Sequence, residues 1–127
     1  MAKNIYDYTV RLDRLSCMSI ANETGPVEKP ENPISYLLVG VLSCIAITAK
    51  QVLEKMRVEF EAVSVNGLLY MVDDKVRYSD RIECSMTVEG GPCQTEEAKE
   101  RLAEIVKKHC SVSVTIAKNP SIKLKVV

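Results

Sequence analysis

The longest apolar stretch of the chain covers residues 33–57, PISYLLVGVLSCIAITAKQVLEKMR. Between residues 36 and 49 its apolar run is interrupted only by small or hydroxyl-bearing residues, Gly40, Ser43 and Thr48. Asn32 is a favourable N-cap, and Pro33 suits the first helical turn. The pattern therefore predicts one long helix, which becomes amphipathic only in its last two turns.

The predicted helix is long for so short a chain. Residues 35–56 would span about 33 Å at 1.5 Å per residue. A folded chain of this size has a radius of gyration of roughly 14 Å. A helix that is apolar on all sides must be covered on all sides, and one small sheet covers one side only. The second helix and loops, or a second copy of the chain, must cover the rest, and we expect a dimer.

A membrane-spanning helix is the weaker interpretation of this stretch. The nearly uncharged run ends at Lys50. It is therefore shorter than the roughly 18 apolar residues that a span requires.

Alternating apolar and polar residues before the helix predict strands. Residues 5–13 alternate with a period of two, and residues 14–21 can form the second strand of a hairpin. Residues 22–32 contain one glycine and two prolines, Gly25, Pro26 and Pro30. This segment is expected to be a loop that leads into the long helix.

The period of two returns after the helix. Residues 58–65 predict a strand with a bulge near its end, and Asn66-Gly67 predicts a turn before a strand at residues 68–72. Asp73-Asp74 indicates a further turn. Residues 82–88 alternate most regularly of all and predict the clearest strand.

The remaining residues predict a second helix and a last strand. Thr95 is the expected N-cap, acidic residues follow it, and an apolar stripe runs along the helix to its basic end near His109. Residues 111–117 are ambiguous between strand and short helix. Residues 122–127 predict a final strand. This order indicates an α+β fold with a mostly antiparallel sheet, in a single domain of residues 1–127.

The amino-acid composition argues against some classes of binding partner. The 127 residues include 17 Lys plus Arg and 17 Asp plus Glu, so the formal net charge is zero. The absence of a basic stripe argues against nucleic acid and anionic membranes as partners. Residues 1–14 contain no apolar signal region, which predicts a cytoplasmic protein.

The chemistry that the residues suggest centres on sulfur. Five cysteines, an odd number without CxxC spacing, are expected to be free thiols in a reducing compartment: Cys17, Cys44, Cys84, Cys93 and Cys110. A cysteine on an apolar helix or strand face is usually a small buried hydrophobe. Cys110 differs because it follows a helix directly, and the N–H groups of a further helix there would stabilise its thiolate.

The sequence gives little support for a metal site or for a catalytic histidine. No pair of cysteines has zinc-ligand spacing and the chain has one histidine, so no metal site is expected. His109 is better explained as a solvated residue at a helix end than as a general base.

Two stretches together resemble the OsmC/Ohr family of thiol peroxidases. They are NPISYLLVGVLSC at residues 32–44 and KKHCSVSVTI at residues 107–116, and the strand and helix between them occur in matching order. The resemblance covers residues 6–127. It implies an OsmC-like fold in which the long central helices of an intertwined homodimer are wrapped by sheets, with the sites at the subunit interface.

The resemblance also implies a reaction. Cys44 would attack an organic hydroperoxide or hydrogen peroxide and become a sulfenic acid. Cys110 would then resolve it as a disulfide, and residues 111–117 would begin as a short helix. An external thiol or dithiol would restore the enzyme, so no cofactor is implied because sulfur carries the redox change.

Activation of Cys44 requires more than the two sulfurs, because a mid-helix cysteine gains little from the helix dipole. The family supplies an arginine from the N-terminal strands, held by a glutamate near the start of the long helix. Arg14 is our preferred match and Arg11 the alternative. Where the glutamate is expected, this chain has Ile34 and Ser35, and the nearest acid is Glu31.

This departure keeps other hypotheses open. The first is a non-catalytic OsmC-like redox sensor or small-molecule-binding homodimer. Another is a structural role for both thiols, with a different small-molecule site. Oxidation of the reduced protein by a hydroperoxide, followed by disulfide mapping, discriminates among them.

Overall fold

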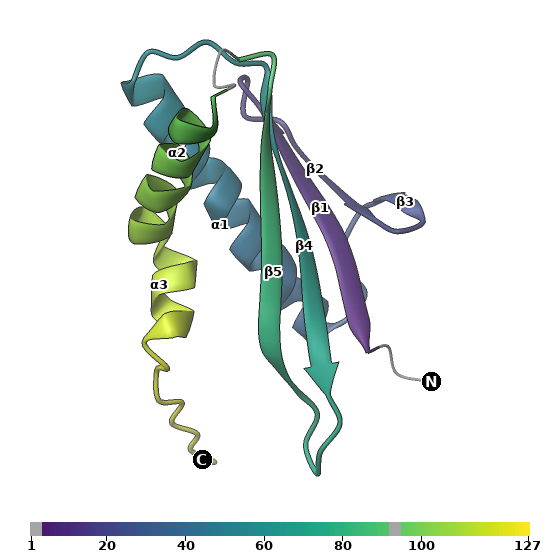
Figure 1. Cartoon of the computed structure of the whole chain (residues 1–127). Coiled ribbons are helices and arrows are strands. Elements are labelled where there is room, and N and C mark those ends of the chain that lie inside the picture. The colour runs from purple at the N-terminus through teal and green to yellow at the C-terminus, as the bar shows by residue number, and fades with distance from the viewer. Residues whose placement is uncertain (1–3, 92–94) are drawn as a thin grey trace.

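The sheet and the three helices lie on opposite sides of the molecule (Figure 1). The computed structural model describes residues 4–91 and 95–127. Its elements are β1 (Ile5–Asp13), β2 (Met18–Asn22), β3 (Gly25–Val27), α1 (Pro33–Lys55), β4 (Ala62–Val72), β5 (Tyr78–Glu89), α2 (Glu96–His109) and α3 (Ser111–Ala117). The five strands form one antiparallel sheet in the order β3-β2-β1-β4-β5. The predicted α+β fold is confirmed.

The predicted long helix is confirmed together with its cap. Asn32 accepts a hydrogen bond from the Ser35 N–H through Oδ1 at 3.0 Å, and its own N–H donates to Ser35 Oγ at 2.9 Å. This reciprocal pair satisfies N–H groups that a helix start leaves unpaired. Asn32 Nδ2 also donates to Tyr6 Oη at 2.9 Å, which fixes the start of α1 against β1.

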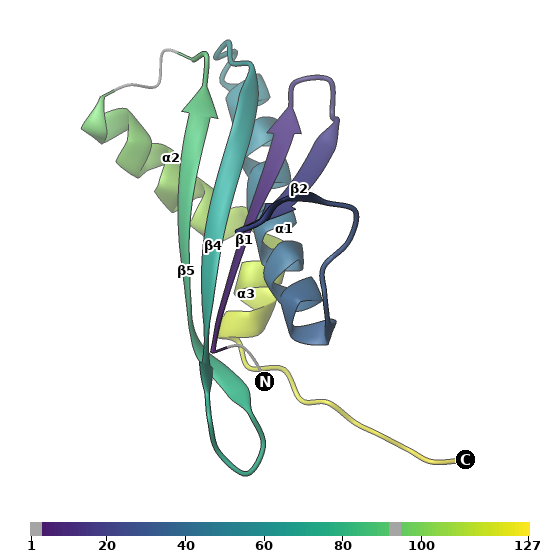
Figure 2. The same cartoon turned by 90° about the vertical axis from the view of Figure 1, so that its right-hand side faces the viewer.

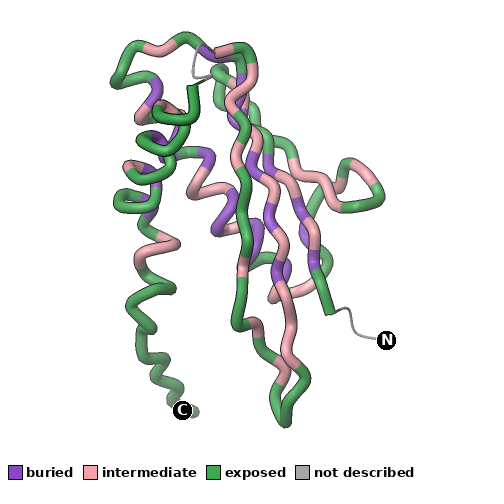
Figure 3. Tube along the Cα trace, in the orientation of Figure 1, coloured by how far each residue is buried: buried purple, intermediate pink, exposed green. Residues whose placement is uncertain are grey.

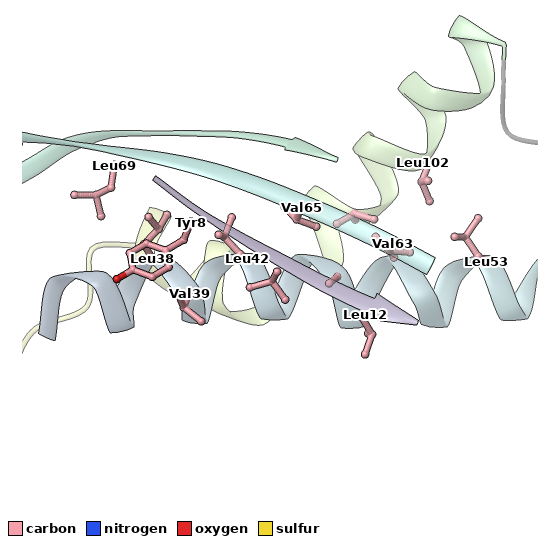
Figure 4. Packing of buried hydrophobic residues seen from close by; sticks show 14 of the residues in the cluster. Tyr8, Leu12, Leu38, Val39, Leu42, Leu53, Val63, Val65, Leu69 and Leu102 are labelled. Carbon is pink, nitrogen blue, oxygen red and sulfur yellow. The ribbon is translucent and has the colours of Figure 1, made fainter. Parts of the chain in front are cut away.

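The core lies between α1 and the β1–β4 pair of the sheet (Figure 4). Leu38 and Leu42 of α1 are completely buried, as are Val10 of β1 and Val65 of β4. By length and composition α1 could cross a membrane, with a mean hydropathy of 1.8 over its most apolar window. Its packing against β1 and β4 is that of a core helix.

One face of α1 is left uncovered by the part of the chain that the structure describes. Tyr36, Leu37 and Ile47 are 53%, 42% and 43% exposed. Gly40 lies between them in open space, and the Cys44 thiol is half-buried on the same part of the helix. The sheet therefore covers α1 from one side, as expected for a sheet of this size.

The predicted Asn66-Gly67 turn is wrong, because β4 passes through both residues without interruption. Gly67 pairs with Tyr8 of β1, and Asn66 pairs with Thr9. Glycine is needed there for close packing, since an added Cβ would lie 2.6 Å from Leu42 Cδ2. The Asn66 side chain donates to Thr9 Oγ1 at 3.0 Å, so it is satisfied within the sheet. The sheet has its register shift at Tyr70/Met71 instead of the expected bulge.

The segments around the helices differ in part from expectation. The strand after α1 begins at Ala62 instead of residue 58, and the predicted loop contains the short strand β3. α2 begins at its predicted cap, where Thr95 Oγ1 accepts from the Ala98 N–H at 3.2 Å. The predicted strand at residues 122–127 is wrong for this chain. These residues are exposed, form no helix or strand, and extend away from the rest of the molecule (Figures 2 and 3).

Candidate thiol site at the junction of the second and third helices

The middle of α1 meets the junction between α2 and α3, which carries Cys110. Figure 2 shows α3 beside α1. Cys44 Sγ lies 3.8 Å from Ser111 Oγ, and Cys110 is completely buried next to it. Residues 111–117 are helical despite their β-branched side chains, which settles the ambiguity of the sequence in favour of the short helix. The fold thus brings together two thiols that the sequence separates widely.

Hydrogen bonds lower the pKa of the Cys44 thiol. Burial by itself raises the pKa of the thiol, but hydrogen bonds outweigh it and lower the pKa below its ordinary value. The groups that lower it are Cys110, the backbone N–H of Val112, and the side chains of Ser111 and Thr48. Each can donate to a thiolate, so the site favours the reactive form of Cys44.

The pKa of Cys110 is shifted in the opposite direction, which favours its protonated form. Burial raises the pKa of its thiol, and both its hydrogen bond to Cys44 and the charge there raise it further. Ser113 Oγ donates to Cys110 Sγ at 3.2 Å and offsets this only in part. The sequence suggested that a helix start would stabilise a thiolate at Cys110. The Ser113 N–H at the start of α3 does lower the Cys110 pKa, but burial and Cys44 outweigh it, whereas the Val112 N–H contributes to the lowered pKa of Cys44.

The arginine and acid candidates lie elsewhere in the chain. Arg14 is exposed on the β1–β2 turn, where its backbone N–H donates to the Glu61 carbonyl at 3.0 Å. Arg11 Nε forms an exposed ion pair with Glu89 at 2.9 Å. The four groups that lower the pKa of Cys44 all belong to α1, α3 or the junction between α2 and α3.

The start of α1 contains no acid in its first turn. Ser35 is completely buried and serves the helix cap. Glu31 precedes the helix and accepts a hydrogen bond from Tyr8 Oη at 3.3 Å. No acid is therefore present where one was expected, at Ile34 or Ser35, and Ser35 takes part in the helix cap instead.

The other cysteines are dispersed. Cys17 is exposed on the β1–β2 turn, Cys84 is exposed on β5, and Cys93 lies outside the described residues. Among the described residues, no group of three or more His, Cys, Asp or Glu side chains could hold a metal ion.

Sequence reasoning missed the hydrogen-bond donors of the site. Thr48 could have been found, because it lies four residues after Cys44 and thus on the same helix face. Ser111 and the Val112 N–H could not, because their role depends on α3 packing against α1.

A groove of about 850 Å³ opens between β5 and the α2–α3 pair. Its apolar walls include Val41, Ile45, Ile82, Met86, Val88 and Leu102. Cys110 and Ser113 line it from the helix side, and Cys84 lines it from β5. The junction thiol is therefore next to a cavity that can admit a small molecule.

The opposite protonation preferences predict selective alkylation. As pH rises, Cys44 should become a thiolate before Cys110, so iodoacetamide should modify Cys44 with a midpoint below that of an ordinary thiol. Replacing Ser111 with alanine removes a donor and should shift the midpoint upward. Ser43→Ala, which changes the neighbouring helix position, is the control. Peptide mass spectrometry after timed alkylation measures each site, and a midpoint at or above the ordinary value would contradict this assignment.

Comparison with known proteins yields a family and a fold. A sequence model described as OsmC-like protein matches residues 28–125. A search of curated proteins found no significant match.

Several solved structures resemble the whole chain. An OsmC-like hydroperoxide resistance protein from Jannaschia sp. is 14% identical, with 98% of this chain and 95% of that chain covered and a TM-score of 0.64. A hypothetical protein from Aquifex aeolicus is 20% identical, with coverages of 97% and 92% and a TM-score of 0.62. An OsmC-like protein from Mycoplasma pneumoniae is 18% identical, with coverages of 94% and 91% and a TM-score of 0.58. At these identities the likeness shows the fold.

Proposed function

We propose that this chain, which belongs to the OsmC-like protein family, is a thiol-dependent peroxidase with Cys44 as nucleophile and Cys110 as resolving thiol. The observation that carries the proposal is the contact of two thiols with opposite protonation preferences. A peroxidase of this kind needs one thiolate to attack and one protonated thiol in reserve. The name of the Jannaschia protein, which refers to hydroperoxide resistance, agrees with this chemistry.

The proposed reaction uses the two sulfurs in sequence. The Cys44 thiolate attacks one oxygen of a hydroperoxide, the O–O bond breaks, and the departing alkoxide takes a proton to leave as an alcohol. Cys44 is then a sulfenic acid. Cys110 attacks its sulfur, water leaves, and a Cys44–Cys110 disulfide remains. Two electrons from an external thiol or dithiol reduce this disulfide and restore both thiols.

The electrostatics of the pair suit this order of events. Burial and the hydrogen bond to Cys44 raise the pKa of Cys110, and the charge on Cys44 raises it further, which favours the protonated thiol before the reaction. Conversion of Cys44 to a neutral sulfenic acid removes that charge. The pKa of Cys110 then falls from its value in the reduced protein, which eases its ionisation for the second step.

We further propose that the chain acts as a homodimer. The uncovered face of α1 carries Tyr36, Leu37 and Ile47, and a second copy would cover it. Residues 122–126 of the exposed segment 118–127 alternate apolar and basic residues, so they would form a strand if another copy supplied a sheet edge. In this assembly Arg14 is proposed to assist Cys44. None of the groups that lower the Cys44 pKa within one chain is a cation, so an arginine would add a kind of stabilisation that these groups do not supply.

We propose that the whole chain, residues 1–127, is one OsmC-like domain that acts in the cytoplasm. A reducing compartment agrees with the free state of the four described cysteines. It also supplies the thiols that the cycle consumes.

Thiol counting during oxidation tests the proposed function. One equivalent of cumene hydroperoxide should remove two thiols per chain and produce one peptide pair linked through Cys44 and Cys110. Arg14→Ala should slow this oxidation by about tenfold if the cation lowers the Cys44 pKa by about one unit, and a comparison with Arg11→Ala distinguishes it from the alternative arginine. If the wild-type protein is oxidised no faster than a free thiol such as glutathione, the peroxidase assignment fails.

A second function rests on two observations. The first turn of α1 has no acid, and the groove of about 850 Å³ has mainly apolar walls. These favour an OsmC-like redox sensor or a small-molecule-binding homodimer without turnover. Slow, stoichiometric oxidation of Cys44 that external thiols fail to reverse would favour this alternative over the enzyme.

A further inference from the structure

A third thiol lines the groove next to the proposed peroxidase site. Cys84 belongs to β5, where Gly67 of β4 is its paired residue, and its side chain is exposed. Cys84 and Cys110 line the same groove from opposite sides. The peroxidase cycle described above uses only Cys44 and Cys110, so Cys84 has no role in it.

The three thiols form a series across the fold. Cys44 on α1 contacts Cys110 at the α2–α3 junction. Cys110 and Cys84 line the same groove. Although Cys84 is accessible to solvent, the groove walls shield it in part and raise its pKa, and the charge of Cys110 raises it further. Cys17, in contrast, is exposed on the β1–β2 turn and is not among the residues that line the groove.

We propose that Cys84 takes over the disulfide from Cys44 and forms a Cys84–Cys110 bond at the groove, where a thiol reductant can reach it. This inference rests on the proposed function, because the Cys44–Cys110 disulfide is its starting point. It adds a third redox residue to the site.

The exchange balances without a further oxidant. The Cys84 thiol loses its proton to solvent, and its sulfur attacks Cys110 Sγ. The Cys84–Cys110 bond forms while the Cys44–Cys110 bond breaks, and Cys44 leaves as a thiolate. The two-electron oxidation thereby moves from Cys44 to Cys84. Cys44 is then ready for another peroxide.

The direction of the exchange follows from the properties of the three sulfurs. A thiol of lower pKa is the better leaving group, and Cys44 has the lowered pKa. Cys110 carries no charge once it is in a disulfide, so burial alone then raises the pKa of Cys84.

The exchange requires the groove to close. A disulfide needs Cα atoms within about 7 Å, so the Cα atoms of Cys84 on β5 and Cys110 at the α2–α3 junction must come within that distance. α3 has no buried residue and Cys110 separates two helices with an extended backbone, so the movement costs mainly the burial of Cys110 itself and the contact of α3 with α1. α2 stays anchored through Leu102 and Val106.

Disulfide mapping over time tests the exchange. After one equivalent of cumene hydroperoxide, the Cys44–Cys110 peptide pair should appear first and the Cys84–Cys110 pair should replace it. In Cys84→Ser only the first pair should form, whereas Cys17→Ser should behave as the wild type. If the first pair forms and Cys84 remains fully alkylatable, the exchange is overturned while the proposed function stands. If neither pair forms, the proposed function fails, and the exchange with it.

A second variant tests the geometry without peroxide. In Cys44→Ser, diamide is expected to couple Cys84 and Cys110 within one chain, which non-reducing electrophoresis and peptide mapping will detect. Adding Cys84→Ser should abolish that product. Failure of diamide to link the two residues, or protection of Cys84 from iodoacetamide in the native protein, would overturn the inference.

Discussion

Replacing Cys44 with serine is expected to lower the rate of peroxide-driven thiol loss on the order of 10³-fold or more. A serine hydroxyl does not ionise in the pH range where the hydrogen bonds at this site stabilise a thiolate, so the attacking anion is lost. The fold should persist, because serine differs from cysteine by one atom and the Cys44 side chain is only half-buried. Stopped-flow oxidation with cumene hydroperoxide, followed by thiol counting, measures the effect.

Two further variants give this prediction its controls. Cys17→Ser removes an exposed thiol from the β1–β2 turn and should leave the rate unchanged. Cys110→Ser should still react, but it should lose one thiol instead of two and accumulate a sulfenic acid that dimedone traps. Full activity of Cys44→Ser would assign the peroxide reaction to another thiol and remove the basis of the proposed function.

The second large expected effect is a loss of stability, and it depends on the contact between Leu42 and Gly67. Leu42→Ala should lower the free energy of unfolding by about 2–5 kcal/mol, because Leu42 is completely buried between α1 and β4. Gly67→Ala alone should cost about 1 kcal/mol or more, since its Cβ would lie 2.6 Å from Leu42 Cδ2. In the double variant the new methyl group occupies space that Leu42 has vacated. The two costs should therefore not add, and the coupling energy should be about 0.5–3 kcal/mol.

Urea unfolding at one fixed protein concentration measures all three variants, because association would otherwise change the apparent stability. Val76→Ala is the control. Val76 lies in the β4–β5 turn and is 76% exposed, so its replacement should stay within about 0.5 kcal/mol. Additive costs in the double variant would show that Gly67 does not contact Leu42 as described.

The elements that depend on local signals could be predicted from the sequence. The start of α1 follows from Asn32 and Pro33, whose capping and backbone preferences act within one turn. The start of α2 follows from Thr95 for the same reason. The alternation at residues 5–13 predicted β1 at its observed bounds, because one face of that strand is buried.

The errors occurred where tertiary contacts override local preference. Asn66-Gly67 is a typical turn sequence, yet β4 is held extended by pairing with β1, and α1 needs the missing side chain at Gly67. Residues 122–127 alternate like a strand, but a strand requires a neighbouring edge, and this chain offers them none in its described part. A pattern of side chains cannot indicate whether that edge is available.

The sequence by itself determined the long helix, its cap, the α+β class and the two cysteines that its resemblance to a family singled out. Only the tertiary structure decided what those cysteines can do. The lowered pKa of Cys44 requires hydrogen bonds from Ser111 and the Val112 N–H, and these groups reach it only because α3 packs against α1. Protonation depends on distances between groups far apart in the chain, and folding alone sets those distances.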